Sequence, residues 1–163
     1  MEIIEATEQD IPVIHDLAEK TWWPTYRTIL SAQQISFMLN AMYSENALKE
    51  QINANVKFLL VKRGGENVAF AGYSIENAPE TLLKIHKIYV LPSEQGKGTG
   101  KLLIEYLSGL AKDLNIPWVE LNVNRGNPAQ GFYQKMGFEI TETVDIPYYE
   151  FVLNDYVMRK KID

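Results

Sequence analysis

Three glycines at alternate positions, Gly96, Gly98 and Gly100, mark the segment of this sequence that is best suited to chemistry. Glycine has no Cβ and adopts positive φ angles readily, so such a loop can bring successive backbone N–H groups onto one anion. An apolar β-type run over residues 82–90 leads into the loop, and a helical pattern over residues 98–114 leaves it. The first turn of that helix adds unpaired N–H groups and a positive dipole end. The loop is therefore predicted to bind a phosphate group.

Two common phosphate-binding motifs do not fit this loop. The dinucleotide fingerprint Gly-x-Gly-x-x-Gly fails because Lys101 stands where its last glycine belongs. A P-loop requires Ser or Thr after Gly-Lys, but Leu102 follows here. A glycine-rich turn without a ligand is the alternative reading. The pattern that does fit is Gln-x-x-Gly-x-Gly, carried by Gln95, Gly98 and Gly100.

With this pattern placed directly after a strand, the sequence resembles the GNAT superfamily of acetyl-CoA-dependent N-acetyltransferases. A second segment, residues 127–138, resembles the family signature Asn-x-x-Ala-x-x-x-Tyr-x-Lys-x-Gly-Phe, with Ala129 and Tyr133 in place. Asn127 stands two residues before Ala129 instead of three. Both Asn127 and Asn124 therefore remain candidates for contact with the cofactor.

The resemblance implies that acetyl-CoA is the cosubstrate and that no metal takes part. In the family, the backbone N–H groups of the loop hold the pyrophosphate of coenzyme A, and the preceding strand pairs with the pantetheine arm. An N–H of Tyr89 or Val90 is implied as the donor that polarises the thioester carbonyl, an interaction worth about 3 kcal/mol. The cofactor-binding residues implied in this way are Ile88, Tyr89, Val90, Gln95, Gly96, Lys97, Gly98, Thr99, Gly100, Lys101, Asn127 and Tyr133.

Two residues are predicted to move protons. Tyr133 matches the family's motif tyrosine, which implies that its phenol protonates the leaving thiolate; the alternative is a tyrosine packed in the core beside Phe132. Many relatives place a glutamate base where this sequence has Lys84. His86 lies two residues further on the same strand face, and its ordinary pKa of about 6.5 suits a general base. The alternative for His86 is a hydrogen bond within the sheet.

The acceptor amine is predicted to meet an aromatic segment near the N-terminus. Trp22, Trp23 and Tyr26 surround Pro24, which is expected to end the first helix and to present these rings on a loop wall. Aromatic faces attract cations, so a cationic amine fits them. The alternative is that the two tryptophans fill the gap between helix and sheet.

This N-terminal region, with residues 42–44 and Leu48, bears a weaker resemblance to the bacterial spermidine/spermine acetyltransferase group. A polyamine is therefore one candidate acceptor, beside other small amines and protein N-termini or lysines. Four carboxylates at expected strand ends can either attract a polyamine or be solvated, namely Glu76, Glu80, Asp145 and Glu150.

Hydrophobic periodicity predicts a mixed α/β chain in one domain that spans residues 1–163. Strands are expected over residues 2–6, 57–62, 67–75, 82–90, 119–123, 138–144 and 150–158. Helices are expected from residue 7 or 10 to a point before Pro24, from Ser31, from Ser44 to Ile52, over residues 98–114 and over residues 129–135. The resemblance implies a mostly antiparallel sheet of about seven strands with a splayed parallel pair, flanked by about four helices.

The composition argues against several other classes of function. The formal net charge is −5 with a pI near 5.1, which argues against a nucleic-acid partner. There is no Cys and there are only two His, so neither a disulfide framework nor a thiolate nucleophile is available, and a His-rich metal centre is not expected. No apolar run is long enough to span a membrane and no secretory signal is evident, so a cytoplasmic location is expected.

Two functional classes remain open from the sequence. The first is an N-acetyltransferase in which the amine attacks acetyl-CoA directly within a ternary complex. The second is a module of the same fold that binds or senses acyl-CoA without catalysis. The resemblance also raises the expectation of a homodimer, because the last strands of many relatives pair or pack between subunits.

Overall fold

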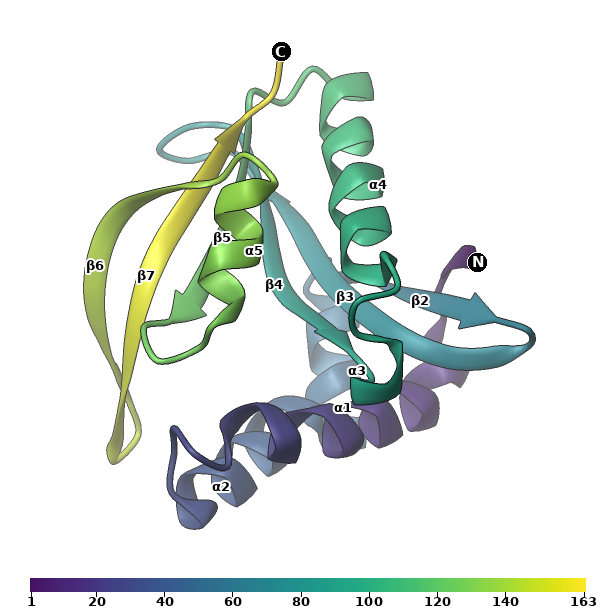
Figure 1. Ribbon diagram of the computed structural model, residues 1–163, viewed down its shortest axis with the longest axis vertical. Helices are drawn as coiled ribbons and strands as arrows, with labels where there is room; N and C mark the ends of the chain where they lie inside the picture. The colour runs from purple at the N-terminus through teal and green to yellow at the C-terminus, as the bar shows by residue number, and fades with distance from the viewer. The chain divides into compact units, whose positions relative to one another are not determined.

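The computed structural model describes residues 1–163 (Figure 1). Its strands are β1 (Glu2–Glu5), β2 (Lys57–Arg63), β3 (Glu66–Glu76), β4 (Leu82–Val90), β5 (Trp118–Asn124), β6 (Glu139–Tyr148) and β7 (Phe151–Lys161). Its helices are α1 (Ile11–Tyr26), α2 (Ala32–Tyr43), α3 (Glu45–Asn53), α4 (Thr99–Asp113) and α5 (Ala129–Lys135). Single 3-10 turns cover Glu8–Asp10 and Pro92–Glu94.

The seven strands form one sheet in the order β1-β2-β3-β4-β5-β7-β6. β4 and β5 pair in parallel, whereas β1 with β2, β2 with β3, β5 with β7 and β6 with β7 pair antiparallel. This topology confirms the mixed α/β fold that was expected, including one parallel pair in a mostly antiparallel sheet.

The chain divides into two compact units, which are described separately. The N-terminal unit comprises Met1–Ser74 and Lys87–Leu103, and the C-terminal unit comprises Ile75–His86 and Ile104–Asp163. In the N-terminal unit, α1, α2 and α3 gather on one side of β2 and β3 (Figure 1). The largest fully buried side chains of this unit are Tyr43, Phe58 and Phe70.

Serine caps begin two of these helices. The Ser31 hydroxyl accepts a hydrogen bond from the Gln34 N–H at 3.1 Å, and the Ser44 hydroxyl accepts one from the Ala47 N–H at 3.2 Å. Each cap satisfies an N–H group that has no partner within its helix. The predicted starts of α2 and α3 are thereby confirmed.

The first helix does not end before Pro24, so the sequence prediction was wrong there. Pro24 lacks an N–H and its ring crowds the carbonyl four residues earlier, but α1 continues to Tyr26. The Arg27 N–H donates to the Trp23 carbonyl at 3.0 Å, and the Thr25 hydroxyl donates to the Thr21 carbonyl at 2.7 Å. Because Pro24 is exposed and lies near the end of the helix, the disturbed turn faces solvent.

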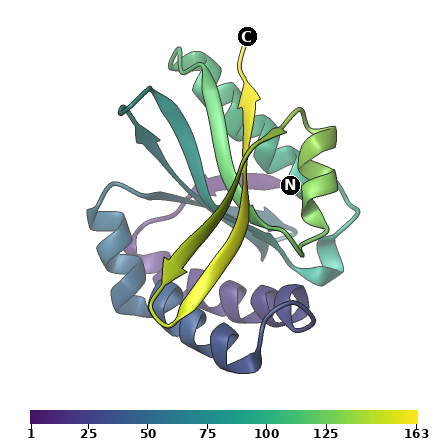
Figure 2. The same ribbon diagram turned by 90° about the vertical axis from the view of Figure 1, so that its left-hand side faces the viewer.

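The C-terminal unit is built around β5. One face of the parallel pair is buried, with Val119 and Leu121 of β5 in register with Leu83 and Ile85 of β4. β6 and β7 form a long curved hairpin beside it (Figure 2). β6 runs through Pro147 to Tyr148, four residues beyond the predicted end at residue 144. β6 is an edge strand, and it tolerates this proline because no neighbouring strand on its open side needs the N–H group that proline lacks.

Candidate active site

The glycine loop of the N-terminal unit has the geometry that anion binding requires. Gly96 and Gly98 adopt φ angles of 81° and 83°, and no atom lies within 4 Å of the position that a Cβ would take. The recorded backbone hydrogen bonds of the loop use the N–H groups of Gln95 and Lys97, which leaves those of Gly96 and Gly98 for another acceptor. All four residues are exposed. The exposed backbone at these two glycines therefore leaves room for a bound diphosphate.

The three remaining loop residues that were predicted to bind the cofactor lie in the first turn of α4. Thr99 is buried, and its hydroxyl lies 3.4 Å from the Met1 sulfur, so its side chain points into the protein. Gly100 is half-buried and Lys101 is exposed. The loop therefore leads directly into the N-terminus of a 15-residue helix, the end whose positive dipole favours an anion.

A buried carboxylate fixes the start of this loop. Glu94 is 3 % exposed, and its carboxylate lies 2.5 Å from Nε of Arg63 and 3.4 Å from Nζ of Lys97. Burial alone would raise the pKa of Glu94, but the hydrogen bonds and charges of Arg63 and Lys97 outweigh it and lower that pKa. Arg63 ends β2, so the ion pair ties the loop to a strand that precedes it by 31 residues.

Breaking this ion pair is expected to weaken acetyl-CoA binding. Glu94→Gln removes the charge that holds Arg63 and Lys97, and the loop then samples conformations in which its N–H groups diverge. We expect the KM for acetyl-CoA to rise by roughly 3- to 10-fold with kcat little changed, because binding is lost equally in the ground and transition states. Steady-state kinetics check this.

The control variants change residues of the hairpin formed by β2 and β3. Arg63→Met should reproduce the effect, and the double variant should be no worse than either single one, because both remove one interaction. Glu66→Gln changes an exposed carboxylate at the start of β3 and should leave the KM unaltered. An unchanged KM in Glu94→Gln would show that the ion pair does not hold the loop.

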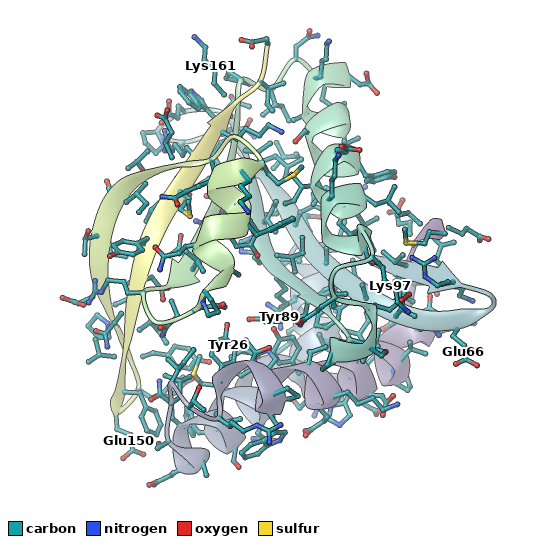
Figure 3. All side chains as sticks on the ribbon, in the orientation of Figure 1. Tyr26, Glu66, Tyr89, Lys97, Glu150 and Lys161 are labelled. Atoms are coloured by element: carbon teal, nitrogen blue, oxygen red, sulfur yellow. The ribbon has the colours of Figure 1, made fainter.

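An aromatic cluster lies beside the strand that leads into the loop. Trp22, Tyr26, Tyr43 and Phe70 are buried, and the ring centroid of Tyr89 lies 5.8 Å from those of Trp22 and Phe70. The hydroxyls of Tyr26 and Tyr89 are 2.8 Å apart (Figure 3). The structure thus joins two residues predicted to meet the acceptor with one predicted to meet the cofactor.

This arrangement differs from the predicted loop wall. Trp22 and Tyr26 lie one turn apart on α1, with centroids 4.6 Å apart, and both are packed into the N-terminal unit. Only Trp23 of the three predicted acceptor residues is half-exposed. The indole N–H of Trp22 is buried without a hydrogen-bond partner. The buried rings of Trp22 and Tyr26 pack against Tyr89 of β4. Trp23 is therefore the ring of this segment that a solute can touch.

Lys87 of β4 carries an amine in an unusual environment. Its Nζ lies 5.4 Å from the centroid of the Tyr43 ring, so the cation faces an aromatic surface. Burial lowers the pKa of Lys87 to about 8. This amine therefore loses its proton closer to neutral pH than an ordinary lysine does.

In the C-terminal unit, Lys84 is held in an ionic network. Its Nζ lies 2.7 Å from the Glu120 carboxylate and 2.6 Å from the Asn122 side-chain oxygen. Arg159 donates to the other oxygen of Glu120 at 2.9 Å and also contacts Glu80. Burial would raise the pKa of Glu120, but the bonds from Lys84 and Arg159 lower it overall. Lys84 is thus a cation held in place by two acceptors on β5.

The second family signature folds into a capped turn before α5. The Asn124 side-chain oxygen accepts from the Gly126 N–H at 2.8 Å, and that of Asn127 accepts from the Ala129 N–H at 2.9 Å. Both asparagines therefore shape the turn with their oxygens and keep their NH₂ groups for other contacts. Tyr133 follows on α5, is 7 % exposed, and packs edge-on against Phe138 at 5.9 Å.

The predicted site residues are divided between the two units. The glycine loop, Ile88 to Val90 and the aromatic residues belong to the N-terminal unit, whereas His86, Asn127 and Tyr133 belong to the C-terminal unit. His86 is exposed on β4. No group of three or more His, Cys, Asp or Glu side chains is arranged to hold a metal ion.

A model of the acetyltransferase (GNAT) family matches residues 17–138, which include both signatures. The chain belongs to the GNAT family. Its GNAT relatives include the spermidine N(1)-acetyltransferase of Thermoplasma acidophilum, which is 25% identical over 100% of this chain and 98% of that protein. The peptidyl-lysine N-acetyltransferase YjaB of Salmonella typhimurium is 42% identical over 33% of this chain and 34% of that protein.

The fold comparison agrees with this GNAT assignment. The PaiA N-acetyltransferase of Thermoplasma acidophilum, solved in complex with coenzyme A, superposes with a TM-score of 0.83 at 25% identity and covers 98% of each chain. The protein is thus a GNAT acyltransferase that uses acetyl-CoA as its cosubstrate and an amine as its acceptor. No helix is both long and apolar enough to cross a membrane.

Proposed function

We propose that the protein transfers an acetyl group from acetyl-CoA to a primary amine of a small cationic molecule, with polyamines as the first class to test. The observation that carries the proposal is the loop at Gly96 and Gly98, two exposed residues with positive φ angles and open space around their Cβ positions just before α4. The spermidine acetyltransferase that matches the whole chain supports the choice of acceptor.

Binding of the cosubstrate is assigned to the loop and to β4. The N–H groups from Gly96 to Lys101 hold the diphosphate, with Gln95 and Lys97 beside them, and Ile88 to Val90 line the pantetheine arm. Acetyl-CoA supplies an activated acyl group as a thioester. The N–H of Tyr89 or Val90 donates to the thioester oxygen, where negative charge develops, and the NH₂ group of Asn127 or Asn124 adds a further contact.

Two side chains are assigned to proton transfer. His86 takes the proton of the acceptor ammonium, directly or through water, because a free amine is needed for attack. The amine nitrogen then bonds to the acyl carbon and the carbon–sulfur bond breaks. The nitrogen releases its second proton to solvent as the amide forms, and Tyr133 gives its proton to the departing sulfur and regains one from solvent. Trp23, the half-exposed ring, contacts the acceptor, whereas Trp22 and Tyr26 are buried and support β4 through their contacts with Tyr89.

One experiment tests the function as a whole. Coenzyme A is titrated into the purified protein in a calorimeter, and thiol release from acetyl-CoA is then measured with mono-, di- and polyamines. We expect saturable coenzyme A binding together with turnover on at least one amine. Binding without turnover on any amine would contradict the acceptor assignment, and absence of binding would contradict the whole proposal. The same assay on His86→Gln tests the base.

A second acceptor class is favoured by one comparison. The match to a peptidyl-lysine N-acetyltransferase covers a third of the chain at 42% identity. A lysine-containing peptide and a peptide with a free N-terminus therefore belong in the amine panel. A kcat/KM that is higher for a peptide than for every small amine would shift the assignment to protein acetylation.

A further inference from the structure

Lys87 of β4 carries an amine that the proposed mechanism leaves unused. Its side chain is half-buried, and its Nζ lies 5.4 Å from the centroid of the Tyr43 ring. Lys57 and Lys97 of the same unit lie within 3.9 Å of a carboxylate, whereas Lys87 belongs to no ion pair. A reaction that removes the charge of Lys87 therefore breaks no ion pair.

The contacts of Lys87 place it on the same side of β4 as Tyr89. The ring of Tyr43, which the ammonium faces, has its centroid 5.6 Å from that of Trp22 and 5.9 Å from that of Phe70. These two rings also contact Tyr89, each at a centroid distance of 5.8 Å. Lys87 and Tyr89 therefore reach one aromatic cluster, as expected for residues two apart on a strand.

This placement brings the Lys87 amine within reach of the position proposed for the thioester. The N–H of Tyr89 or Val90 is assigned to the thioester oxygen, and two residues of a strand span about 7 Å. The amine of a lysine is carried on a flexible four-carbon stem, so a change of rotamer moves Nζ along the strand by a comparable length. A thioester that lies along β4 is therefore accessible to Lys87.

The environment of this amine also favours its reactive form. Burial lowers the pKa of Lys87 to about 8, and no charged neighbour contributes to the shift. About half of the Lys87 side chains are then uncharged at pH 8, whereas an ordinary lysine with a pKa of about 10.4 is almost wholly protonated. Only the uncharged amine is a nucleophile.

From this geometry we propose that Lys87 is a self-acetylation site, whose amine takes the acetyl group of the acetyl-CoA bound to the same molecule when no acceptor amine is present. The inference rests on the proposed function, because both reactions use the same bound thioester. The product is an amide, so the acetyl group stays on Lys87 and is not passed on to an acceptor.

The atoms of this step balance without a further reactant. The Lys87 ammonium first loses one proton to solvent. Its nitrogen then bonds to the acyl carbon, and the carbon–sulfur bond breaks. The nitrogen releases a second proton to solvent as the amide forms, and the sulfur takes one up. The products are acetylated Lys87 and coenzyme A.

The test follows the acetylation of individual lysines. The unaltered protein is incubated with acetyl-CoA at about pH 8 without an acceptor amine, and acetylated lysines are located and quantified by mass spectrometry of proteolytic fragments. The matched control is Lys62, a half-buried lysine of strand β2 in the same unit. We expect Lys87 to be acetylated at least about tenfold faster than Lys62, because a neighbouring bound donor raises its effective concentration.

Two further measurements show whether the bound thioester is the donor. Excess coenzyme A should slow the acetylation of Lys87 at least about tenfold and leave that of Lys62 unchanged, because it displaces only bound acetyl-CoA. Dilution of the protein by about tenfold at saturating acetyl-CoA should leave the rate constant for Lys87 unchanged, because donor and amine belong to one complex.

The inference is overturned if Lys87 is acetylated no faster than Lys62, if excess coenzyme A does not slow it, or if its rate constant falls on dilution. A protein that binds coenzyme A and acetylates an added amine but leaves Lys87 unmodified would overturn this inference alone. Absence of coenzyme A binding would contradict the proposed function as well.

Discussion

Gly98→Val is expected to weaken coenzyme A binding by at least about tenfold. Gly98 adopts a φ of 83°, a conformation that costs a residue with a side chain of the order of 1–3 kcal/mol, and more for a β-branched one. The loop can relieve this strain only by rotating its backbone, which turns the outward N–H groups away from the diphosphate. Since about 1.4 kcal/mol corresponds to a tenfold change in affinity, isothermal titration with coenzyme A resolves the effect.

Two control variants distinguish loss of the coenzyme A site from the general effect of backbone strain. Gly65 in the turn between β2 and β3 also has a φ of 83° and open space around its Cβ position, so Gly65→Val carries the same backbone strain away from the loop. It should lower the melting temperature and leave coenzyme A affinity within about twofold. Gly109→Ala, in α4 with open space around its Cβ position, should leave the affinity unchanged and raise the melting temperature slightly, because alanine favours the helix. Equal affinity losses in Gly98→Val and Gly65→Val would mean that the loop is not the binding site.

Local features of this fold were predictable because short-range chemistry decides them. Ser31 and Ser44 cap helices by bonding to N–H groups three residues away, so the residue types and their spacing were sufficient. The same holds for the strand, glycine loop and helix from residue 82 to residue 113. The two signatures then identified the family, because each joins special backbone positions to side chains a few residues apart.

At Pro24, tertiary packing outweighed the local tendency of proline to end a helix. A proline near the end of a helix disturbs only one hydrogen bond, and the packing of Trp22 and Tyr26 against Tyr89 compensates for it. As a result, the rings of Trp22 and Tyr26 pack against β4 and do not line a loop. No property of the segment around Pro24 reveals this, because Tyr89 lies 63 residues from Tyr26.

The carboxylates of greatest interest escaped sequence analysis for a similar reason. Glu94 reads as an ordinary surface residue in a polar turn, and only its contact with Arg63 explains its burial. Glu80 and Asp145 read as strand-end charges that are solvated or attract a polyamine, and their ion pairs with Arg159 and Arg125 become visible only once the strands are paired. Ion pairing is a property of strand register, which a single sequence does not contain.

Tyr133→Phe is expected to lower kcat at least about tenfold while the affinity for coenzyme A stays within about twofold. The phenol has a reference pKa of about 10 and the leaving thiol one of about 8.5, so a nearby hydroxyl can give the sulfur a hydrogen bond or a proton as its negative charge develops. The ring is 7 % exposed and packs against Phe132 and Phe138, and phenylalanine keeps those contacts. The substitution therefore removes the hydroxyl and little else.

Thiol release at saturating acetyl-CoA and amine measures this effect, and the melting temperature distinguishes chemistry from packing. An interaction made only in the transition state lowers kcat and kcat/KM together, whereas a packing defect lowers the melting temperature and leaves the turnover of the folded fraction intact. Tyr106→Phe on α4 removes the hydroxyl of a tyrosine that is 44 % exposed and should change neither quantity. If Tyr133→Phe turns over at the rate of the unaltered enzyme, the proton reaches the sulfur from solvent, and the tyrosine serves the core alone.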